Sequence, residues 1–180
     1  MKNKSHEFYL FIVLILISAS FTFLPVDHYV VSSGYSIGFV SADPSGTFSS
    51  MSGDIYFSDS DLANSKFNLA IDISSISTGN GMKNKKAQTA EWFNAAAYPK
   101  IKFISTKITK SNAGYSITGD LTIKGVTKSY TIPATRVVSG NIIKFSGVFN
   151  VDRIAFNVGK KSAVVPDKMK ITYMIPATKK

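Results

Sequence analysis

Side chains that could carry out catalysis are scarce in this 180-residue chain. It has no cysteine and two histidines, His6 and His28. A Ser–His–Asp arrangement needs a histidine held within hydrogen-bond reach of its nucleophile, and a zinc site needs clustered His or Cys. Asp120 follows Gly119, a setting in which Asp usually bonds to local backbone instead of acting as an acid. We therefore expect no catalytic residues, no metal site and no enzymatic activity.

One arginine stands apart because it lies among aromatic residues. Arg153 falls between Phe149 and Phe156, so its guanidinium could contact the polar head group of a ligand. It could instead pair with a carboxylate, Asp152 or Asp120, and lock a turn. We favour the turn, because the planar fork of arginine serves structural pairing at least as often as ligand binding.

The chain is basic, with 21 Lys and Arg against 11 Asp and Glu, a net charge of +10. Only Arg136 and Arg153 are arginines, and all other basic residues are lysines. Readout of bases and phosphates favours the bidentate arginine fork, so we expect no nucleic-acid partner. A diffuse lysine surface would suit an anionic membrane surface or an envelope polymer. The simpler interpretation, which we favour, places the lysines on solvated outer faces of strands.

The first 20 residues have the pattern of an export signal. Lys2 and Lys4 precede an apolar run from Phe8 to Ile17, and Ser18-Ala-Ser20 supplies the small residues that a signal peptidase accepts. The apolar run is shorter than the roughly 18–20 residues of a spanning helix. We expect residues 1–20 to be a cleaved signal peptide, residues 21–180 to form one domain, and the protein to be exported to the periplasm. An uncleaved N-terminal membrane anchor is the alternative.

Most of the chain alternates apolar and polar residues, which is typical of half-buried strands. The clearest stretch is Tyr115–Pro133, where two alternating runs flank a break at Lys124-Gly125. Similar runs separated by short turns predict an all-β fold of eight or nine antiparallel strands. Met82–Ala97 lacks this alternation and has no Gly or Pro. We expect it to be the one short helix, ended by Tyr98-Pro99.

Strands in this number form either a sandwich or a closed barrel, and periodicity does not separate the two. A closed barrel of eight strands leaves an interior that side chains fill or that holds one small ligand. A solid core and a pocket both fit the pattern. The aromatic residues best placed to line such an interior are Phe39, Phe57, Trp92, Phe103, Phe145 and Phe149.

Five segments together resemble the YceI-like family of exported bacterial proteins. They are Gly119–Lys128 (GDLTIKGVTK), Tyr98–Thr106 (YPKIKFIST), Ser75–Gly79 (SISTG), Trp92–Asn94 (WFN, where the family has FFD) and Val151–Gly159 (VDRIAFNVG, similar to NRxxFGVG). Each motif alone is weak, but the five occur in the family's order. The chain departs from the family before the FF pair, where Lys83, Asn84, Lys86 and Ala87 replace an Arg-Asp-x-His-Leu run.

The resemblance implies an extended, antiparallel, eight-stranded, lipocalin-like β-barrel whose apolar pocket takes a long-chain lipid, a polyisoprenoid or an isoprenoid quinone. It favours the pocket over the solid core, and the expected role is sequestration or transport of that lipid. The alternative is a non-enzymatic envelope protein with a solid core and a Lys-rich binding surface, and a homodimer is compatible with either. The expected pocket residues are Phe39, Phe57, Leu69, Ile71, Trp92, Phe93, Phe103, Ile117, Leu121, Tyr130, Phe145 and Phe149, with Arg153 as the candidate head-group contact.

Overall fold

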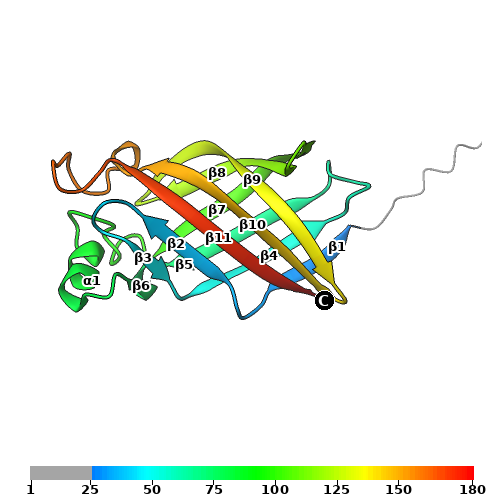
Figure 1. The fold of residues 1–180 in the computed structure, drawn as a ribbon, viewed down its shortest axis with the longest axis horizontal. Helices are drawn as coiled ribbons and strands as arrows, with labels where there is room; N and C mark the ends of the chain where they lie inside the picture. Colours follow the sequence, from blue (N-terminus) through cyan, green and yellow to red (C-terminus); the bar gives the residue numbers. More distant parts are fainter. Residues whose placement is uncertain (1–25) are drawn as a thin grey trace, which may run out of the picture.

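Eleven strands form one continuous antiparallel sheet in residues 26–180, the part of the chain that the computed structural model describes (Figure 1). The strands are β1 Asp27–Val31, β2 Ser36–Val40, β3 Gly46–Phe48, β4 Met51–Phe57, β5 Lys66–Asp72, β6 Ile76–Ser77, β7 Lys100–Ser111, β8 Gly114–Ile123, β9 Val126–Ser139, β10 Ile142–Asp152 and β11 Lys168–Lys179. One helix, α1, covers Gly81–Gln88, and two 3-10 turns, η1 and η2, cover Ile73–Ser75 and Ile154–Phe156.

Eight of these strands close the sheet into a barrel. Their order is β1-β4-β5-β7-β8-β9-β10-β11, and β11 returns to pair with β1 through Tyr29–Lys179 and Val30–Thr178. Closure pairs both long edges of the sheet, so neither is left open for another chain. The predicted closed, eight-stranded antiparallel barrel with one short helix is confirmed.

The other three strands, β2, β3 and β6, lengthen the barrel toward α1. Both β1 and β2 pair with β11, at residues 177–179 and 170–174 respectively, so they act as two halves of one wall strand. Gly34 lies in the break between them with φ of +88°, a conformation that glycine adopts without strain. β3 then pairs with β2 on one side and β6 on the other.

The stretch Tyr115–Pro133 forms the hairpin that its alternation predicts. Lys124 and Gly125 make the two-residue turn between β8 and β9, with φ of +48° and +75°. Two left-handed residues are what the favoured tight hairpin turn requires. β9 runs on through Pro133 to Ser139, so the second strand is longer than its clearest alternating run.

The predicted helix Met82–Ala97 is shorter than expected. α1 starts after Asn80, whose Oδ1 accepts the backbone N–H groups of Met82 and Lys83. It ends at Gln88, because Thr89 is extended. Further along, Asn94 takes the left-handed conformation with φ of +51°. Residues 89–97 form a series of turns instead, which brings Trp92 and Phe93 under α1.

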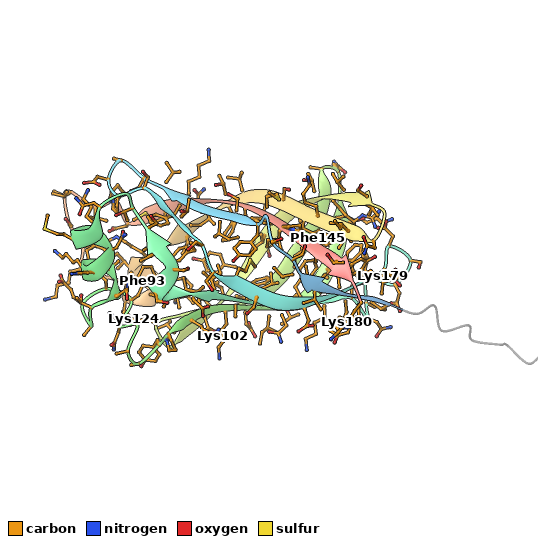
Figure 2. The ribbon with its side chains drawn as sticks, turned by 90° about the horizontal axis from the view of Figure 1, so that it is seen from below. Phe93, Lys102, Lys124, Phe145, Lys179 and Lys180 are labelled. Carbon is orange, nitrogen blue, oxygen red and sulfur yellow. The ribbon has the colours of Figure 1, made fainter. Side chains whose placement is uncertain are left out.

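The half of the barrel near the C-terminus is filled by aromatic side chains. Phe145 is 1% exposed, and its ring centroid lies 4.9 Å from that of Phe67 and 5.1 Å from that of Phe57. Edge-to-face pairs of this kind add about 0.5–1.5 kcal/mol beyond the burial itself. Figure 2 shows Phe145 in this half and Phe93 near α1 in the other.

The predicted signal peptide, residues 1–20, lies outside the described residues. Within residues 26–180 no helix has the length and apolar character needed to cross a bilayer. No three His, Cys, Asp or Glu side chains in that same part of the chain are grouped so that they could hold a metal ion.

Candidate functional site

The half of the barrel nearest α1 holds an apolar cavity of about 340 Å³. Protein cores rarely leave voids larger than a water molecule, and an engineered cavity of ~150 Å³ already admits benzene. This cavity is therefore a built space and not a packing defect. Its apolar walls are Ile37, Phe39, Phe48, Ile71, Ile76, Ile101, Leu121, Ile123, Phe149, Val151, Met169 and Ile171 from the strands, with Ala87, Trp92, Phe93, Val158, Val164 and Val165 from the segments around α1 and the loop after β10.

A second cavity of about 90 Å³ continues the first toward the middle of the barrel. The two share six wall residues, so they are neighbours inside the barrel, and we call them together the channel. Beyond them the second cavity reaches Phe67 and Phe145, the edge of the aromatic cluster. The shared walls are Ile37, Ile71, Ile101, Leu121, Phe149 and Ile171.

A polar group lies behind the aromatic cluster, beyond the walls of the two cavities. The Arg136 guanidinium lies 5.4 Å from the ring centroid of Phe57 and pairs with Asp59. Asp59 also accepts the Tyr115 hydroxyl. Burial, reinforced by this hydrogen bond, raises the pKa of Tyr115, so the hydroxyl keeps the proton that it donates.

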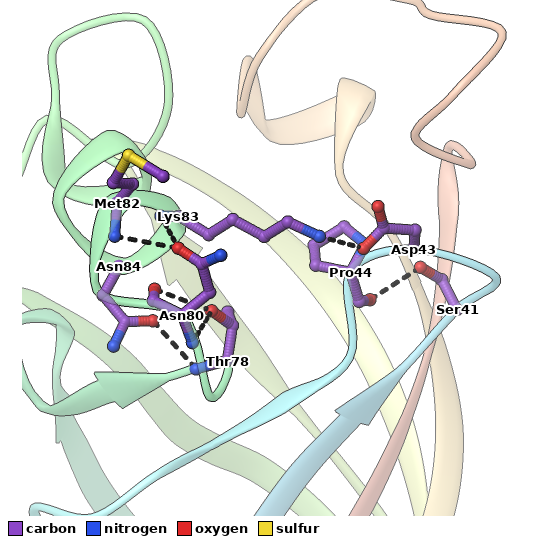
Figure 3. Close-up of polar contacts among 8 residues, drawn as sticks. All are labelled: Ser41, Asp43, Pro44, Thr78, Asn80, Met82, Lys83 and Asn84. Carbon is purple, nitrogen blue, oxygen red and sulfur yellow. Dashed lines mark hydrogen bonds and ion pairs between the residues drawn. The ribbon is translucent and has the colours of Figure 1, made fainter.

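The other end of the channel reaches the surface between α1, loop 41–45 and loop 153–167, and we call this end the mouth. Lys83 Nζ lies 2.6 Å from Asp43 Oδ1, which joins α1 to loop 41–45 (Figure 3). Asn84 Oδ1 accepts the Thr78 N–H at 2.8 Å and the Thr78 hydroxyl at 2.7 Å, which fixes α1 onto the end of β6. Polar side chains of the cavity wall are therefore concentrated at the mouth.

Arg153 lines the cavity, but its guanidinium is directed to the protein. Nε donates to Pro166 O at 2.9 Å, Nη1 to Val158 O at 2.8 Å and Nη2 to Val165 O at 2.8 Å. Nη2 also lies 3.3 Å from Asp167 Oδ1, and the side chain is 4% exposed. Arg153 thus holds loop 153–167 in shape from inside.

The predicted carboxylate partner of Arg153 was wrong, although its expected part in locking a loop agrees with these bonds. The partner is Asp167, in the segment that leads into β11, and not Asp152 or Asp120. Asp152 Oδ1 instead accepts the Ile154 N–H at 2.9 Å and starts the η2 turn. Contact between Arg153 and a lipid head group stays a prediction.

Two cationic side chains lie over the indole ring of Trp92. Arg153 Cζ lies 5.5 Å from the indole centroid and Lys86 Nζ lies 6.0 Å from it, both within cation–π range. Gly159, with φ of +69°, lets the loop approach: a Cβ there would lie 3.0 Å from Trp92 Cζ3. The indole Nε1 is buried and has no hydrogen-bond partner among the described residues.

Ten of the twelve predicted pocket residues lie on the walls of the two cavities, and Phe57 and Tyr130 do not. Phe57 lies behind Phe145 in the aromatic cluster, and Tyr130 packs against Phe156 with ring centroids 5.7 Å apart. For all twelve, contact with a ligand stays a prediction. The ten are Phe39, Leu69, Ile71, Trp92, Phe93, Phe103, Ile117, Leu121, Phe145 and Phe149.

Sequence reasoning missed most of the mouth. Lys83, Lys86, Pro44 and Val164 line the cavity from loops and from α1, where no period-2 pattern marks an inward face. By contrast Ile37, which also went unpredicted as a pocket residue, stands in a clear alternating run. The same signal that selected Phe39 could have found it.

Known proteins match this chain over different lengths. A model of the YceI-like domain matches residues 21–177. The UPF0312 protein of Vibrio campbellii is 37% identical over 97 residues, which is 53% of this chain and 51% of the relative. Protein YceI of Escherichia coli strain UMN026 is 35% identical over 96 residues, 53% of this chain and 50% of the relative. The chain thus spans about half the length of the curated relatives it matches.

Solved structures share the barrel over most of the chain. BcnA of Burkholderia cenocepacia is 31% identical, with a TM-score of 0.75 over 80% of this chain and 96% of that one. The YCEI protein of Campylobacter jejuni is 25% identical, with a TM-score of 0.69 over 78% and 88%. A polyisoprenoid binding domain from Saccharophagus degradans is 12% identical, with a TM-score of 0.67 over 86% and 99%, and supports the fold alone.

Proposed function

The chain belongs to the YceI-like domain family, and we propose that it binds one long apolar lipid, a polyisoprenoid or an isoprenoid quinone, inside the barrel. The observation that carries the proposal is the apolar channel formed by the cavities of about 340 and 90 Å³. The proposed role is sequestration or transport of the lipid through an aqueous space, without catalysis. The ligand class follows the family resemblance, and a structural neighbour that is a polyisoprenoid binding domain is consistent with it.

Burial of the lipid chain supplies the binding energy. Each methylene-sized unit moved from water into an apolar site gains about 0.8 kcal/mol, so ten such units gain about 8 kcal/mol before the entropy of ordering is subtracted. A chain of several tens of carbons gains correspondingly more, which exceeds the roughly 4–15 kcal/mol that association costs. The walls therefore need no polar anchor, which accounts for a pocket with few conspicuous residues.

The position of polar groups orients the bound lipid. The inner end of the channel meets the ring of Phe145, whereas Thr78, Lys83 and Lys86 lie at the mouth. An apolar tail would enter first and end against Phe145, and a quinone, hydroxyl or phosphate group would stay near Lys86. This arrangement pairs each part of an isoprenoid lipid with matching surroundings.

The alternative, an envelope protein with a solid core, fits the structure less well. Empty space weakens packing, because the atoms around it lose contacts. A barrel whose interior served only stability would therefore be filled by side chains and not hold an apolar channel. A Lys-rich outer surface is compatible with lipid binding and does not require the solid core.

We also propose that the protein is exported, with residues 1–20 removed and the periplasm as its destination. The support is the order of Lys2 and Lys4, the apolar run Phe8–Ile17 and the small residues Ser18-Ala-Ser20. N-terminal sequencing of protein from the native host tests this. A mature chain that begins near residue 21 supports cleavage, and an intact Met1 in the membrane fraction supports the anchor instead.

Lipid extraction tests the binding function. Protein purified from its host is extracted and the extract analysed by mass spectrometry, for wild type and for two variants of neighbouring residues on β10. Phe149→Asp places a charge in the channel, because Phe149 lines both cavities, whereas Val148→Asp changes a side chain that is 47% exposed.

We expect an isoprenoid lipid in wild type and in Val148→Asp and its loss from Phe149→Asp, with circular dichroism confirming that both variants fold. The proposal fails if wild type carries no apolar molecule and shows no saturable binding of an isoprenoid quinone after delipidation. It fails equally if Phe149→Asp, correctly folded, retains the same lipid.

A further inference from the structure

Lysines gather on the segments at the end of the barrel that carries the mouth. Four segments lie at the mouth end: loop 41–45, residues 78–99 with α1, turn 124–125 and loop 153–167 (Figure 1). Apart from the pair Arg153–Asp167, they carry six lysines against Asp43 and Glu91, a net charge of +4. Loops 58–65, 112–113 and 140–141 at the other end carry Asp59 and Asp61 and no basic residue. The basic residues near those loops are largely paired, Lys179 with Asp27 and Arg136 with Asp59. The six are Lys83, Lys85, Lys86, Lys124, Lys160 and Lys161.

Four of these lysines have no ion pair within the described residues. Lys83 is held by Asp43, and Lys124 Nζ donates to Glu91 O and Asn157 O. Lys85 and Lys86 on α1, and Lys160 and Lys161 on loop 153–167, form no ion pair with any part of the chain that the structure describes and are exposed. Lys85, Lys160 and Lys161 are therefore free to meet an external partner, whereas the Lys86 ammonium already lies over the Trp92 ring.

The two most exposed large apolar side chains of the described residues lie at the same end. Met82 on α1 is 80% exposed, and Val164 on loop 153–167 is 68% exposed. Val164 also lines the cavity, as does Lys86. Figure 3 shows Met82 at the outer side of α1, above the Lys83–Asp43 pair. The mouth is thus flanked by apolar tips beside unpaired lysines.

We propose that this end of the barrel docks on the surface of a bilayer that contains anionic lipids. The docking face consists of Met82, Val164, Lys85, Lys86, Lys160 and Lys161. Apolar side chains surrounded by lysines bind such surfaces because the tips enter the interfacial region while the ammonium groups remain among anionic head groups. A soluble anionic polymer would use the lysines but would give Met82 and Val164 no partner.

Docking in this orientation places the mouth against the membrane. A lipid could then enter the channel from the bilayer without exposing its full chain to water, a consequence that rests on the proposed function. The docking itself rests only on the charges and the apolar tips.

Vesicle flotation tests the proposal. The protein used is residues 26–180, which contain every strand of the closed barrel and omit the apolar run Phe8–Ile17. It is mixed with vesicles of phosphatidylcholine alone or of phosphatidylcholine with phosphatidylglycerol. We expect binding to the anionic vesicles and little to the neutral ones, and a decrease in binding as salt is raised, because added salt screens exposed charges.

Two charge-reversal variants separate the docking face from general basicity. Lys85, Lys160 and Lys161 are changed to Glu in one variant. In the other, Lys107, Lys128 and Lys144 are changed to Glu; these three are exposed on the barrel wall and form no ion pair within residues 26–180. Each lysine near an anionic surface is worth about fivefold in partitioning, and the glutamates add repulsion, so the first triple variant should lose at least on the order of 100-fold. The wall variant, with the same net charge, should keep most of the binding.

Met82→Ser with Val164→Ser tests the apolar tips, and this double variant removes no charge. We expect it to lose the part of the binding that survives high salt. Equal loss in the two triple variants, or no change in the double variant, overturns the proposal. Lipid content is measured on the same samples by extraction, so that a protein that carries lipid but does not bind vesicles disproves docking while leaving the proposed function intact.

Discussion

Lys83 Nζ lies 2.6 Å from Asp43 Oδ1, and this contact links α1 to the loop after β2 across the rim of the cavity. Both side chains are about half exposed, so the pair adds at most about 1 kcal/mol to stability. The pair matters more for the entry of a ligand into the cavity, because α1 and loop 41–45 form part of the mouth.

Breaking this pair should speed lipid exchange with little effect on folding. Lys83→Met is expected to raise the release rate of a bound fluorescent lipid by up to about fivefold, the factor that corresponds to the energy of an exposed pair. The melting temperature should stay close to that of wild type. Lys85→Met, on the same helix without an ion pair in the described residues, is the matched control. Equal release rates for the two variants would show that the pair does not restrain the mouth.

Phe145 should limit the length of the bound chain. It stands at the inner end of the channel, 1% exposed and backed by Phe57 and Phe67. Phe145→Leu removes ring volume that joins the channel, at a cost of roughly 1–2 kcal/mol in stability. The lipids that co-purify, identified by mass spectrometry, are expected to shift toward longer chains by less than one isoprene unit on average, because leucine frees less volume than five carbons occupy. Phe156→Leu is the control, since Phe156 is fully buried but lines neither cavity. If both variants carry the same lipids as wild type, Phe145 does not set the length.

The strand residues that face the interior of the barrel were predictable, because side chains alternate between the two faces of a strand. Ile117, Leu121 and Phe145 stand at alternate positions of long strands, and each points inward. Tyr130 follows the same rule on β9, yet it lines neither cavity. The β9–β10 ladder ends at Thr135–Ser146, and beyond that point Tyr130 packs against Phe156 of η2. The alternation of residues along β9 is the same whether its inward side chains face the cavity or η2, so the sequence of β9 does not indicate this change of neighbour.

The mouth was not predictable for a different reason. Asp43 and Lys83 are 40 residues apart, and Arg153 reaches Asp167 across a loop with no regular pattern. Contacts of this kind depend on how separate segments meet at the end of a closed barrel. Asn80, which caps α1, carried a local signal, whereas the turns after Gln88 depend on packing of Trp92 and Phe93 under the helix.

Arg153 should be required for the shape of loop 153–167. Arg153→Met removes donors to three backbone carbonyls, and we expect a loss of about 3 kcal/mol, since hydrogen bonds from charged groups contribute about 1.5–3 kcal/mol each and the loop can recover some solvation. Arg153→Lys should not rescue it, because an ammonium group cannot reproduce the fork.

Urea unfolding measures the stability of these two variants, and limited proteolysis reports on the loop. Cleavage near Lys160 and Lys161 should become faster in both. A full rescue by lysine would indicate that charge, and not the three-way geometry, holds the loop.

Asp72 should make the fold more stable at neutral than at acid pH. A hydrogen bond from Lys100, at 2.8 Å, and a second from Ser50, at 2.5 Å, lower the pKa of Asp72 below its ordinary value. The unfolded chain then binds a proton at a higher pH than the folded protein does, so stability rises with pH across the interval between the two pKa values. The contribution is fully present above the unfolded value, near 3.9, and is lost as the pH falls through the folded value. Because the Asp72 side chain is 35% exposed and that of Lys100 is 42% exposed, we expect only about 0.5 kcal/mol.

Asp72→Asn isolates this contribution. Urea unfolding at pH 7, 5, 4 and 3 should show the variant to be less stable than wild type at pH 7 and 5. The difference should shrink below pH 4, where the wild-type carboxylate takes up its proton. Lys100→Met should reproduce most of the loss, since the bond from Lys100 is the largest cause of the lowered pKa, and Ser50→Ala a smaller part. A gap between wild type and Asp72→Asn that is the same at pH 7 and pH 3 would mean that the carboxylate acts through packing and not through its charge.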